Sequence, residues 1–360
     1  MRLLLVSTDL QHMGGVVETV KLFMREFEGK VDVTHAAFGR RVNQKGIMRI
    51  FRTLADLFCF ARLLSGNRFD IIHMNPSMNL VSVLKEAALF FVFYLFGYSG
   101  KVLIFIHGWD DVFFKRLASG RITAVLLRTV FNRAGLITVL ADDFKKELIR
   151  SKVDASKVEV VSTMVDMAKV PASSACKGDG KSLLFLSRMI VGKGVYELLD
   201  GYALLSERYS GLKLVMAGDG PELEALKMRA ADLGLKDISF PGYIQDEDKF
   251  MVLQENCIYL LPTSREGCPV SLLEAMASGM ASVVTGAGGI KDFIQPGKTA
   301  ILLEEVSAEA IAESVGILID NPDLRISVAE NARNYATEHF ASGKVAERIL
   351  EFYSRLVPGK

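Results

Sequence analysis

The sequence has few cysteines and no pattern typical of a metal site. Its 360 residues include four cysteines, with neither a CxxC pair nor a histidine–cysteine spacing suited to zinc. We therefore expect four reduced thiols. The acids at 246–248 lie close together, but they are expected to begin a helix. The sequence thus predicts no metal cofactor. The cysteines are Cys59, Cys176, Cys257 and Cys268.

The chain also lacks a long apolar run. The longest, Ala87–Phe96, is about half of what a membrane-spanning helix needs and is more typical of a buried or interfacial helix. At the N-terminus a brief apolar run is followed by polar residues and a glycine pair, which is not the pattern of a signal peptide. We therefore expect a cytoplasmic protein.

Two common phosphate-binding motifs are missing as well. No GxGxxG can be completed from Gly14, from Gly15 or from the later glycine-rich segments, which excludes the dinucleotide-binding fingerprint. The GDGKS segment at 178–182 has Ala175 where a P-loop needs glycine. This segment also precedes an expected strand, whereas a P-loop follows one.

What the chain does contain is a regular alternation of short apolar runs and longer helical patterns. Continuous runs such as LLLV and VLIFI are typical of strands covered on both faces of a parallel sheet. Two series of this kind predict an α/β protein with two doubly wound, Rossmann-like domains that face each other across a ligand-binding cleft. Strands are expected near 2–8, 31–37, 70–74, 101–107, 136–140, 158–162, 182–187, 212–217, 238–240, 257–261, 281–285 and 299–302.

A segment rich in Pro, Ser, Gly and Lys marks the domain boundary. It spans 171–181 and has no periodicity, so it reads as a linker. We predict an N-terminal domain over 1–170 and a C-terminal domain over 171–341. A last helix follows from about 342, and its apolar positions alone do not indicate where it packs.

Charge is distributed unevenly between the two halves. The net charge of the whole chain is +1, yet residues 1–170 carry about +8 and the remainder about −7. Two stretches of the first half, 40–62 and 113–133, combine cations with apolar residues at roughly helical spacing. They fit ordinary helices packed on a sheet, or helices that lie on an anionic membrane surface. They lack an aromatic stacking pattern, so no nucleic-acid partner is predicted.

Several motifs suit an anionic, hydroxyl-rich ligand. Gly14–Gly15 follows the first strand and precedes a helix expected near Val17, where a backbone can approach a ligand closely or simply form a tight turn. Arg188 and Lys193 follow the first strand of the second half. They are solvated surface cations or groups that neutralise a diphosphate.

The segment EGCPVSLLEAMASG at 266–279 is the most informative. Pro269 suits the first turn of a helix and Gly279 its C-terminal cap. Glu266 then lies before the helix and Glu274 inside it. Carboxylates accept hydrogen bonds from sugar hydroxyls, and free N–H groups of a helix start bind phosphate. The segment therefore offers ligands for sugar or ribose hydroxyls and for phosphate, unless Glu266 is only an acid before a helix start and Glu274 a solvated acid of the helix.

Two histidines end neighbouring expected strands, His73 in DIIHMNPS and His107 in KVLIFIHGWD. Such a histidine can bond a sugar hydroxyl or assist proton movement, or it can be structural. We favour His107 as the functional one.

With these motifs the chain resembles the family-four retaining glycosyltransferases of the GT-B fold, also called glycosyl transferases group 1. The family's Glu-x7-Glu motif is matched by Glu266 and Glu274, and its Arg and Lys by Arg188 and Lys193. Further similar segments are Gly14–Gly15, MAGDGPE at 216–222, FPGYI at 240–244 and GAGG at 286–289. Asp292 stands where a Glu is usual, Thr163–Met164 replaces an Asn-Gly loop, and Ala141 replaces Ser, which puts acceptor geometry in doubt.

The resemblance also implies roles for individual residues. Glu266 would contact the transferred sugar with His107 beside it, and Glu274 would bind the ribose. Arg188 and Lys193 would hold the diphosphate, and the backbone near Tyr243 and Ile244 would meet the base. The last helix would pack on the N-terminal domain. The remaining donor contacts would come from Gly14, Gly15, Gly267, Cys268, Pro269 and Val270.

The function implied is metal-independent, retaining transfer of a hexose-type sugar from a nucleotide diphosphate sugar, a UDP-sugar in our interpretation. The acceptor would be a saccharide or a lipid-linked glycan of cell-surface polysaccharide synthesis, at the inner face of the membrane. A nucleotide-sugar epimerase or hydrolase, or a non-catalytic nucleotide-sugar-binding subunit, remains an alternative. The sequence does not indicate which sugar, base, acceptor or oligomeric state applies.

Overall fold

The computed structural model describes residues 1–11, 14–39, 48–171 and 179–359, with 48–50 described by their backbone alone. The chain divides into two compact units. The first unit is Met1–Thr163 with Ser342–Lys360, and the second is Met164–Ala341. Most of the linker expected at 171–181, and the side chain of Cys176, lie outside the described residues.

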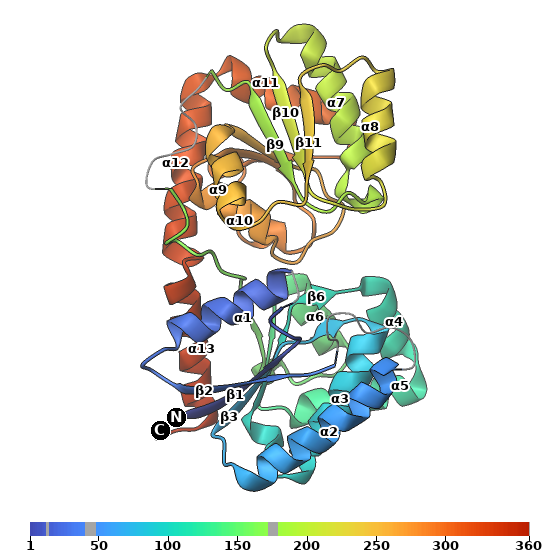
Figure 1. Ribbon diagram of the computed structural model, residues 1–360, viewed down its shortest axis with the longest axis vertical. Helices are drawn as coiled ribbons and strands as arrows, with labels where there is room; N and C mark the ends of the chain where they lie inside the picture. Colours follow the sequence, from blue (N-terminus) through green and yellow to red (C-terminus); the bar gives the residue numbers. More distant parts are fainter. Residues whose placement is uncertain (12–13, 40–47, 172–178, 360) are drawn as a thin grey trace. The chain divides into compact units, whose positions relative to one another are not determined.

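A six-stranded parallel sheet forms the centre of the first unit (Figure 1). Its strand order is β2-β1-β3-β5-β7-β8. The expected strands are confirmed here. The central strands β1, β3, β5 and β7 are buried on both faces because helices cover the sheet from both sides, whereas the edge strands β2 and β8 are mostly half-buried. The strands are β1 Arg2–Ser7, β2 Asp32–Ala37, β3 Ile71–Met74, β5 Val102–Ile106, β7 Leu136–Val139 and β8 Val158–Val160.

Seven helices surround this sheet among the described residues. Helices α1 and α13 contact each other, while α2 contacts α3 and α4 contacts α5. Figure 1 shows α2, α3, α4 and α5 gathered on the side of the sheet away from α1 and α13. The helices are α1 Gly15–Glu26, α2 Met48–Gly66, α3 Leu80–Leu95, α4 Asp111–Ser119, α5 Arg121–Arg133, α6 Asp142–Arg150 and α13 Ser342–Leu356.

The second unit has its own six-stranded parallel sheet, in the order β11-β10-β9-β12-β13-β14. All six strands expected in the second half are confirmed. They are β9 Ser182–Leu186, β10 Lys213–Ala217, β11 Ile238–Gly242, β12 Ile258–Leu261, β13 Ala281–Thr285 and β14 Ile301–Leu303. The helices are α7 Val195–Arg208, α8 Leu223–Asp232, α9 Asp246–Glu255, α10 Val270–Ala277, α11 Ala308–Asp320 and α12 Pro322–His339, with short 3₁₀ turns η3 Val191–Lys193 and η4 Gly288–Asp292.

The strand orders place a topological switch point in each sheet. In the first unit the chain leaves β1 toward β2 and returns to β3 on the other side of β1. In the second unit it runs from β9 to β10 and β11, then returns to β12 on the other side of β9. Ligands of open α/β sheets bind beyond the carboxyl ends of the strands at such points. The loops after β1 and β3, and those after β9 and β12, are therefore the candidate site loops.

The last helix, α13, packs within the first unit. The Tyr353 hydroxyl lies 2.5 Å from His73 Nδ1 on β3, and Arg355 forms a 2.9 Å ion pair with Glu159 on β8. The inward residues Val345, Ile349 and Phe352 are buried. The second unit is thus inserted between the main part of the first unit and that unit's final helix along the chain.

Two elements were not expected from sequence. Strands β4 Ser77–Met78 and β6 Gly108–Trp109 pair with each other just beyond β3 and β5. Helix α1 begins at Gly15, two residues before the expected start near Val17.

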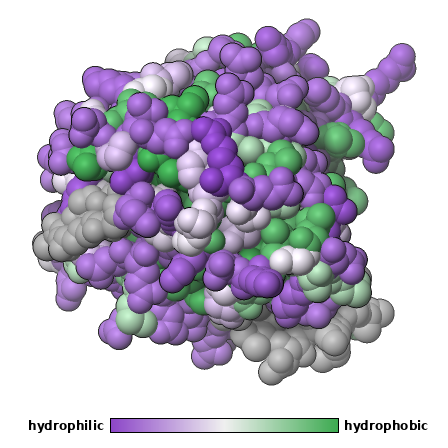
Figure 2. Space-filling view, turned by 90° about the horizontal axis from the view of Figure 1, so that it is seen from above, coloured by the Kyte–Doolittle hydropathy of each residue, from purple (hydrophilic) through white to green (hydrophobic). Residues whose placement is uncertain are grey.

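Among the described residues, no helix has the length and apolarity needed to cross a membrane. The face drawn in Figure 2 is mainly hydrophilic, with hydrophobic side chains in small groups among polar ones.

Candidate functional site

The loops after β9 and β12 come together in the second unit. Ser264 donates its backbone N–H to the Gly192 carbonyl at 3.1 Å, and Thr263 Oγ1 lies 3.2 Å from the same oxygen. Gly194 has φ 65°, and a side chain there would overlap the Pro262 carbonyl. Glycine therefore permits the close approach that brings Lys193 to the loop carrying Glu266.

Lys193 and Glu266 form an ion pair between these two loops. The Lys193 ammonium donates to Glu266 Oε1, and both side chains are largely buried. An ammonium has three donors, so this contact leaves others for a second anion. Lys193 is held at the end of η3, where its stem is packed and its charge lies at the carboxyl edge of the sheet. The sequence-predicted cation and acid are thus brought into contact.

The GAGG segment supports Glu266 from the other side. Gly289 donates its N–H to the Glu266 carbonyl at 3.1 Å. Gly288 has φ 56°, and a side chain at this position would overlap the Glu266 backbone. Glycine is therefore needed here both for the left-handed backbone and for the contact. The similarity of GAGG to the family pattern thus has a structural reason within this chain.

Helix α10 begins directly after Glu266, Gly267 and Cys268. Pro269 is its N-cap, one residue before the helical turn expected for it, and Leu272 and Leu273 donate to the Pro269 carbonyl at 3.1 and 3.2 Å. The N–H groups of the first turn, including that of Val270, are oriented along the helix axis as in anion-binding helix starts. The helix ends as expected before Gly279, which has φ 72°.

Glu274 lies on α10 and is only 7% exposed. Its Oε1 accepts from Lys249 Nζ on α9 at 2.6 Å. A buried carboxylate needs such a partner, because an unpaired charge in this position is costly. Lys249 was not among the sequence-predicted site residues. It precedes Glu274 by 25 positions on another helix, so no spacing rule could indicate the pair.

The other predicted residues of the second unit lie on the neighbouring loops. Arg188 lies two residues after the end of β9 and is exposed. Tyr243 and Ile244 follow β11, and the Gly242 carbonyl accepts from the Gly218 N–H at 2.7 Å. Tyr243 is exposed and Ile244 is partly buried. All of these positions are at the carboxyl edge of the second sheet.

The remaining predicted residues belong to the first unit. Gly14 is the N-cap of α1 with φ 146°, and Gly15 begins the helix. The Gly14 carbonyl accepts from the Glu18 N–H at 3.1 Å. The pair therefore forms the start of the first helix after β1, as expected from sequence.

His107 follows β5 and is bonded to Asn75, which follows β3. Its Nε2 lies 2.8 Å from Asn75 Oδ1, and Asn75 Nδ2 donates to the Val6 carbonyl of β1 at 3.0 Å. With the amide oriented in this way, His107 carries its proton on Nε2 and keeps Nδ1 as an acceptor. Burial lowers the pKa of His107 to about 3, so the ring is neutral near pH 7. Asn75 was not predicted from the sequence, because it belongs to no motif and meets His107 only when β3 and β5 pair.

His73 has a structural role instead. It is fully buried, bonded to Tyr353 and stacked among Phe23 and Phe105. Burial, with a smaller contribution from His107, lowers its pKa to about 3. His73 therefore ties β3 to α13 and is not available to a ligand.

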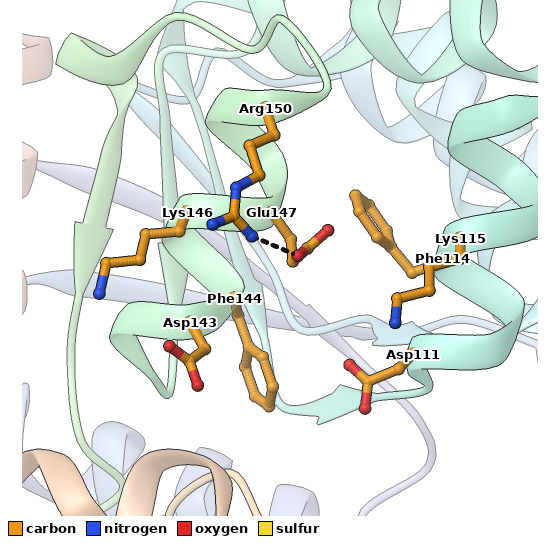
Figure 3. Close-up of a pocket in the computed structure, with 8 residues that line it drawn as sticks. All are labelled: Asp111, Phe114, Lys115, Asp143, Phe144, Lys146, Glu147 and Arg150. Atoms are coloured by element: carbon orange, nitrogen blue, oxygen red, sulfur yellow. Dashed lines mark hydrogen bonds and ion pairs between the residues drawn. The ribbon is translucent and has the colours of Figure 1, made fainter.

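A polar cavity of about 400 Å³ lies between α4 and α6 (Figure 3). Arg150 and Glu147 form a 2.8 Å ion pair at its edge. The ring of Phe144 stacks on Trp109 with centroids 4.6 Å apart, which places the cavity next to the end of β6. Its lining consists of Asp111, Phe114, Lys115, Asp143, Phe144, Lys146, Glu147 and Arg150.

The described residues contain no group of three histidine, cysteine or acidic side chains arranged to hold a metal ion. The second unit instead gathers three cations, two carboxylates and the start of helix α10. This set can bind phosphate oxygens through Lys193, Arg188 and α10, and hydroxyl groups through Glu266 and Glu274.

Comparison with known proteins shows which family this chain resembles in sequence and in fold. A glycosyl transferases group 1 model matches residues 166–335, and a glycosyltransferase family 4 model matches 13–169. An uncharacterized glycosyltransferase of Methanocaldococcus jannaschii is 25% identical over 302 residues, 80% of this chain and 76% of that protein. Several further curated relatives are matched over about half of their length.

One of these is the N,N'-diacetylbacillosaminyl-diphospho-undecaprenol alpha-1,3-N-acetylgalactosaminyltransferase of Campylobacter jejuni, 27% identical over 176 residues, 49% of this chain and 45% of that protein. Among solved structures, Anabaena HepE in complex with UDP and glucose matches with a TM-score of 0.76 at 16% identity, over 99% of this chain and 100% of that chain. With family models on both halves and the fold matched throughout, the chain belongs to the glycosyl transferases group 1, the family-four glycosyltransferases of the GT-B fold, which transfer sugars from nucleotide sugars.

Proposed function

We propose that the protein is a retaining glycosyltransferase that moves a hexose-type sugar from a UDP-sugar to a saccharide or lipid-linked acceptor, without a metal ion. The observation that carries this proposal is the arrangement of Lys193, Glu266 and Glu274 around the start of α10. Cations and carboxylates alternate there over a short distance. A nucleotide sugar presents the same alternation of phosphates and hydroxyl groups.

In this proposal the charge of the leaving diphosphate is neutralised by the protein. Lys193 uses one donor to Glu266 and the others to phosphate oxygens, and Arg188 and the N–H groups of α10 add to them. Glu274 binds the ribose hydroxyls, and Lys249 keeps this carboxylate in place. The backbone near Tyr243 and Ile244 meets the base.

The transfer step follows from the same residues. The bond between the anomeric carbon and the phosphate oxygen breaks, and the acceptor oxygen bonds to that carbon from the same face. The acceptor's proton passes to the leaving phosphate oxygen, so the reaction balances without a cofactor. Glu266 accepts hydrogen bonds from the sugar and orients it. Neutral His107 of the first unit has an acceptor nitrogen for a hydroxyl group.

A thermal-shift panel with UDP, GDP and ADP, with and without chelator, tests the donor. We expect UDP to stabilise the protein equally in both conditions, by mass action on a single site. The complex of HepE with UDP and glucose is the support for uridine. A shift with GDP alone would mean that the donor nucleotide contains guanine and not uracil. A shift that chelator abolishes would overturn the metal-free proposal.

We propose an acceptor that is a glycan of cell-surface polysaccharide synthesis, held at the inner face of the membrane. The undecaprenol in the name of the Campylobacter jejuni relative and the cations of the stretches 40–62 and 113–133 support a lipid-linked acceptor. The polar cavity of Figure 3 suits its saccharide part, since Asp111 and Asp143 can accept from hydroxyls. Asp143→Asn would then raise the acceptor KM and leave the donor KM unchanged.

The alternatives give different products. An epimerase or hydrolase would convert the same nucleotide sugar without an acceptor, and a non-catalytic subunit would bind it unchanged. Incubating the protein with a radiolabelled UDP-sugar and a membrane extract separates them. Label in a lipid or saccharide fraction supports transfer, while label only in free sugar, in an epimer or in intact donor would reject it.

A further inference from the structure

Helix α3 presents an outward face that is entirely apolar. Leu84, Phe91 and Leu95 are 63%, 58% and 64% exposed, at spacings that place them along one stripe of the helix. Leu80 and Val81 extend this stripe at the N-terminal end. A helix on the surface of a water-soluble domain normally has the opposite pattern, with its polar face outward.

The two charged residues of α3 are turned inward instead. Lys85 and Glu86 form a 3.3 Å ion pair, and both side chains are mostly buried. Lys85 also lies over the Phe38 ring, 5.2 Å from its centroid. Burial raises the pKa of Glu86, with the nearby Lys85 opposing that shift. Exposing this pair to water would be less costly than burying it, so the outward apolar stripe needs a reason outside the unit itself.

The helices beside α3 continue this surface. On α2, Phe51, Leu54 and Phe58 are exposed, and on α5, Ile122 and Leu126 are exposed. Helix α2 contacts α3, and α3 and α5 line a common cavity, so the three stripes are neighbours. Contiguous apolar surface of this kind marks a site that is covered by something apolar.

Charge indicates what covers it. Arg62 on α2 and Arg121 and Arg133 on α5 are exposed on the helices that carry the stripes. The acids of α2, α3 and α5 within the described residues are Asp56 and Glu86, and both point inward. An apolar surface on helices whose exposed charges, within the described residues, are all cations is complementary to the hydrocarbon layer and anionic headgroups of a membrane.

The apolar face also opens into the molecule. A cavity of about 100 Å³ lies between α3 and α5, with Leu84 and Leu126 at its exposed rim. Its inner wall includes Met78 and Ile106 and is almost wholly apolar. Ile106 directly precedes His107, so the cavity reaches toward the carboxyl ends of β3 and β5. Glu86 also lines the cavity and is paired with Lys85. The remaining wall is suited to a hydrocarbon chain and offers almost no polar group to a sugar.

We propose that the α3 face enters the hydrocarbon layer of an anionic membrane, and that the cavity between α3 and α5 takes in one hydrocarbon chain from that layer. The proposal rests on the proposed function, since it makes the acceptor a membrane lipid that carries a glycan. It also assigns the insertion to α3, a helix outside both basic stretches.

Vesicle co-sedimentation of the full chain tests the insertion. The probes are vesicles of phosphatidylcholine with phosphatidylglycerol, and of phosphatidylcholine alone. The variant combines Leu84→Gln, Phe91→Gln and Leu95→Gln, all at exposed positions, so the fold should be retained. We expect about a hundredfold weaker binding to the anionic vesicles, from loss of roughly 1 kcal/mol per inserted side chain.

A matched control carries Leu204→Gln, Met228→Gln and Met251→Gln, exposed apolar residues of the second unit. This control should bind vesicles like the wild type. The double variant Arg62→Gln and Arg121→Gln should weaken binding about fivefold per cation, and raised salt should do the same. Equal binding by the α3 variant and the wild type would overturn the insertion. So would apolar self-association of the wild type that persists when vesicles are present.

The single tryptophan of the chain reports on the cavity. Trp109 pairs with Met78, which lines the cavity, through β6 and β4. Vesicles of phosphatidylglycerol brominated along its acyl chains should quench Trp109 fluorescence, because bromine quenches only at close range. Ala87→Phe narrows the cavity and should remove the quenching while co-sedimentation continues. Strong binding of the wild type without quenching would reject the chain-binding cavity.

A parallel measurement separates this proposal from the donor proposal. The α3 variant should keep the thermal shift with UDP, since its substitutions lie in the first unit. If vesicle binding is lost and the UDP shift stays, the membrane face is supported independently of activity. If the wild type shows no UDP shift but binds and is quenched, the donor assignment fails and the membrane face stands.

Discussion

The two units share an architecture and differ in what they expose. In the second unit, large apolar side chains reach the surface singly, among them Met228 on α8, Met251 on α9 and Ile326 on α12. In the first unit they gather on α2, α3 and α5. Conversely, the second unit buries paired charges at the carboxyl edge of its sheet, where Lys193 meets Glu266 and Lys249 meets Glu274. The same fold thus has a charged sheet edge in the second unit and an apolar helical face in the first.

The difference shows that the sheet sets where a site can lie and the side chains set what it binds. Both units have a switch point, and both place functional candidates on the loops beside it. The second unit places the Lys193–Glu266 ion pair beside that point. In the first unit, His107 and Asn75 are hydrogen-bonded across the strand ends. We propose that the charged groups of the second unit hold most of the donor and that the first unit supplies the acceptor side, and the following experiments test that division.

The largest effect is expected from Glu266→Gln. The amide keeps the shape but loses the charge that holds Lys193, so the cation is no longer fixed where the diphosphate leaves. We expect kcat/KM for transfer to fall about a thousandfold, roughly 4 kcal/mol of transition-state stabilisation. Steady-state kinetics measure it, and Glu224→Gln on α8 is the control. Activity within about tenfold of the wild type would show that Glu266 has no essential role in the transfer step.

Acid should unfold the first unit before the second. Burial lowers the pKa of both His73 and His107 to about 3, against an ordinary value of 6.5. The unfolded chain therefore binds more protons in this range. Stability is fully present above about pH 6.5 and falls as the pH drops toward 3, by roughly 1.4 kcal/mol per pH unit for each histidine.

By sequence, residues 164–341 contain one histidine, the exposed His339. Hydrogen exchange read by mass spectrometry between pH 7 and pH 4 follows both units at once, and Trp109 fluorescence follows the first alone. His107→Gln should reduce the acid dependence of the first unit by about half, with His339→Gln as the control. Equal acid sensitivity of the two units would contradict the assignment.

Gly288→Ala tests how the second unit holds Glu266. The added Cβ would overlap the Glu266 backbone and occupy a left-handed conformation. We expect the free energy of unfolding to fall by about 2–3 kcal/mol and transfer to weaken as Glu266 moves. Gly297 also has a positive φ but open space around it, so Gly297→Ala should cost only about 1 kcal/mol. Chemical denaturation measures both losses. Equal losses would mean that the close contact with the Glu266 backbone does not contribute to the destabilisation.

The smallest effect is expected from Lys249→Met. Loss of the ammonium removes the 2.6 Å ion pair with Glu274, which in our proposal positions this carboxylate for the ribose. The donor KM should rise about tenfold, near 1.4 kcal/mol, with kcat almost unchanged. Lys227→Met removes a comparable but exposed pair with Glu224 and should change neither constant. An equal loss in kcat would move Lys249 from positioning to the chemical step.

Much of the fold could be predicted because the central strands of both sheets are buried on both faces and read as unbroken apolar runs. The strands at the sheet edges, such as β2 and β11, are more exposed, and the alternation of strands and helices along the chain indicated them. The short pair β4 and β6 could not be predicted, since two-residue strands leave no periodic signal and form only where β3 and β5 end side by side.

The sequence by itself determined the two-sheet architecture and the residue types at the candidate site, because periodicity and loop motifs are local properties of the chain. Only the tertiary structure decided which groups meet. Lys249 joins Glu274 and Asn75 joins His107 across distances in sequence that no motif records. Tertiary packing also decided that Lys85 and Glu86 turn inward while Phe91 and Leu95 face outward. An apolar run is hydrophobic on every side, so its sequence cannot say which side the core will bury.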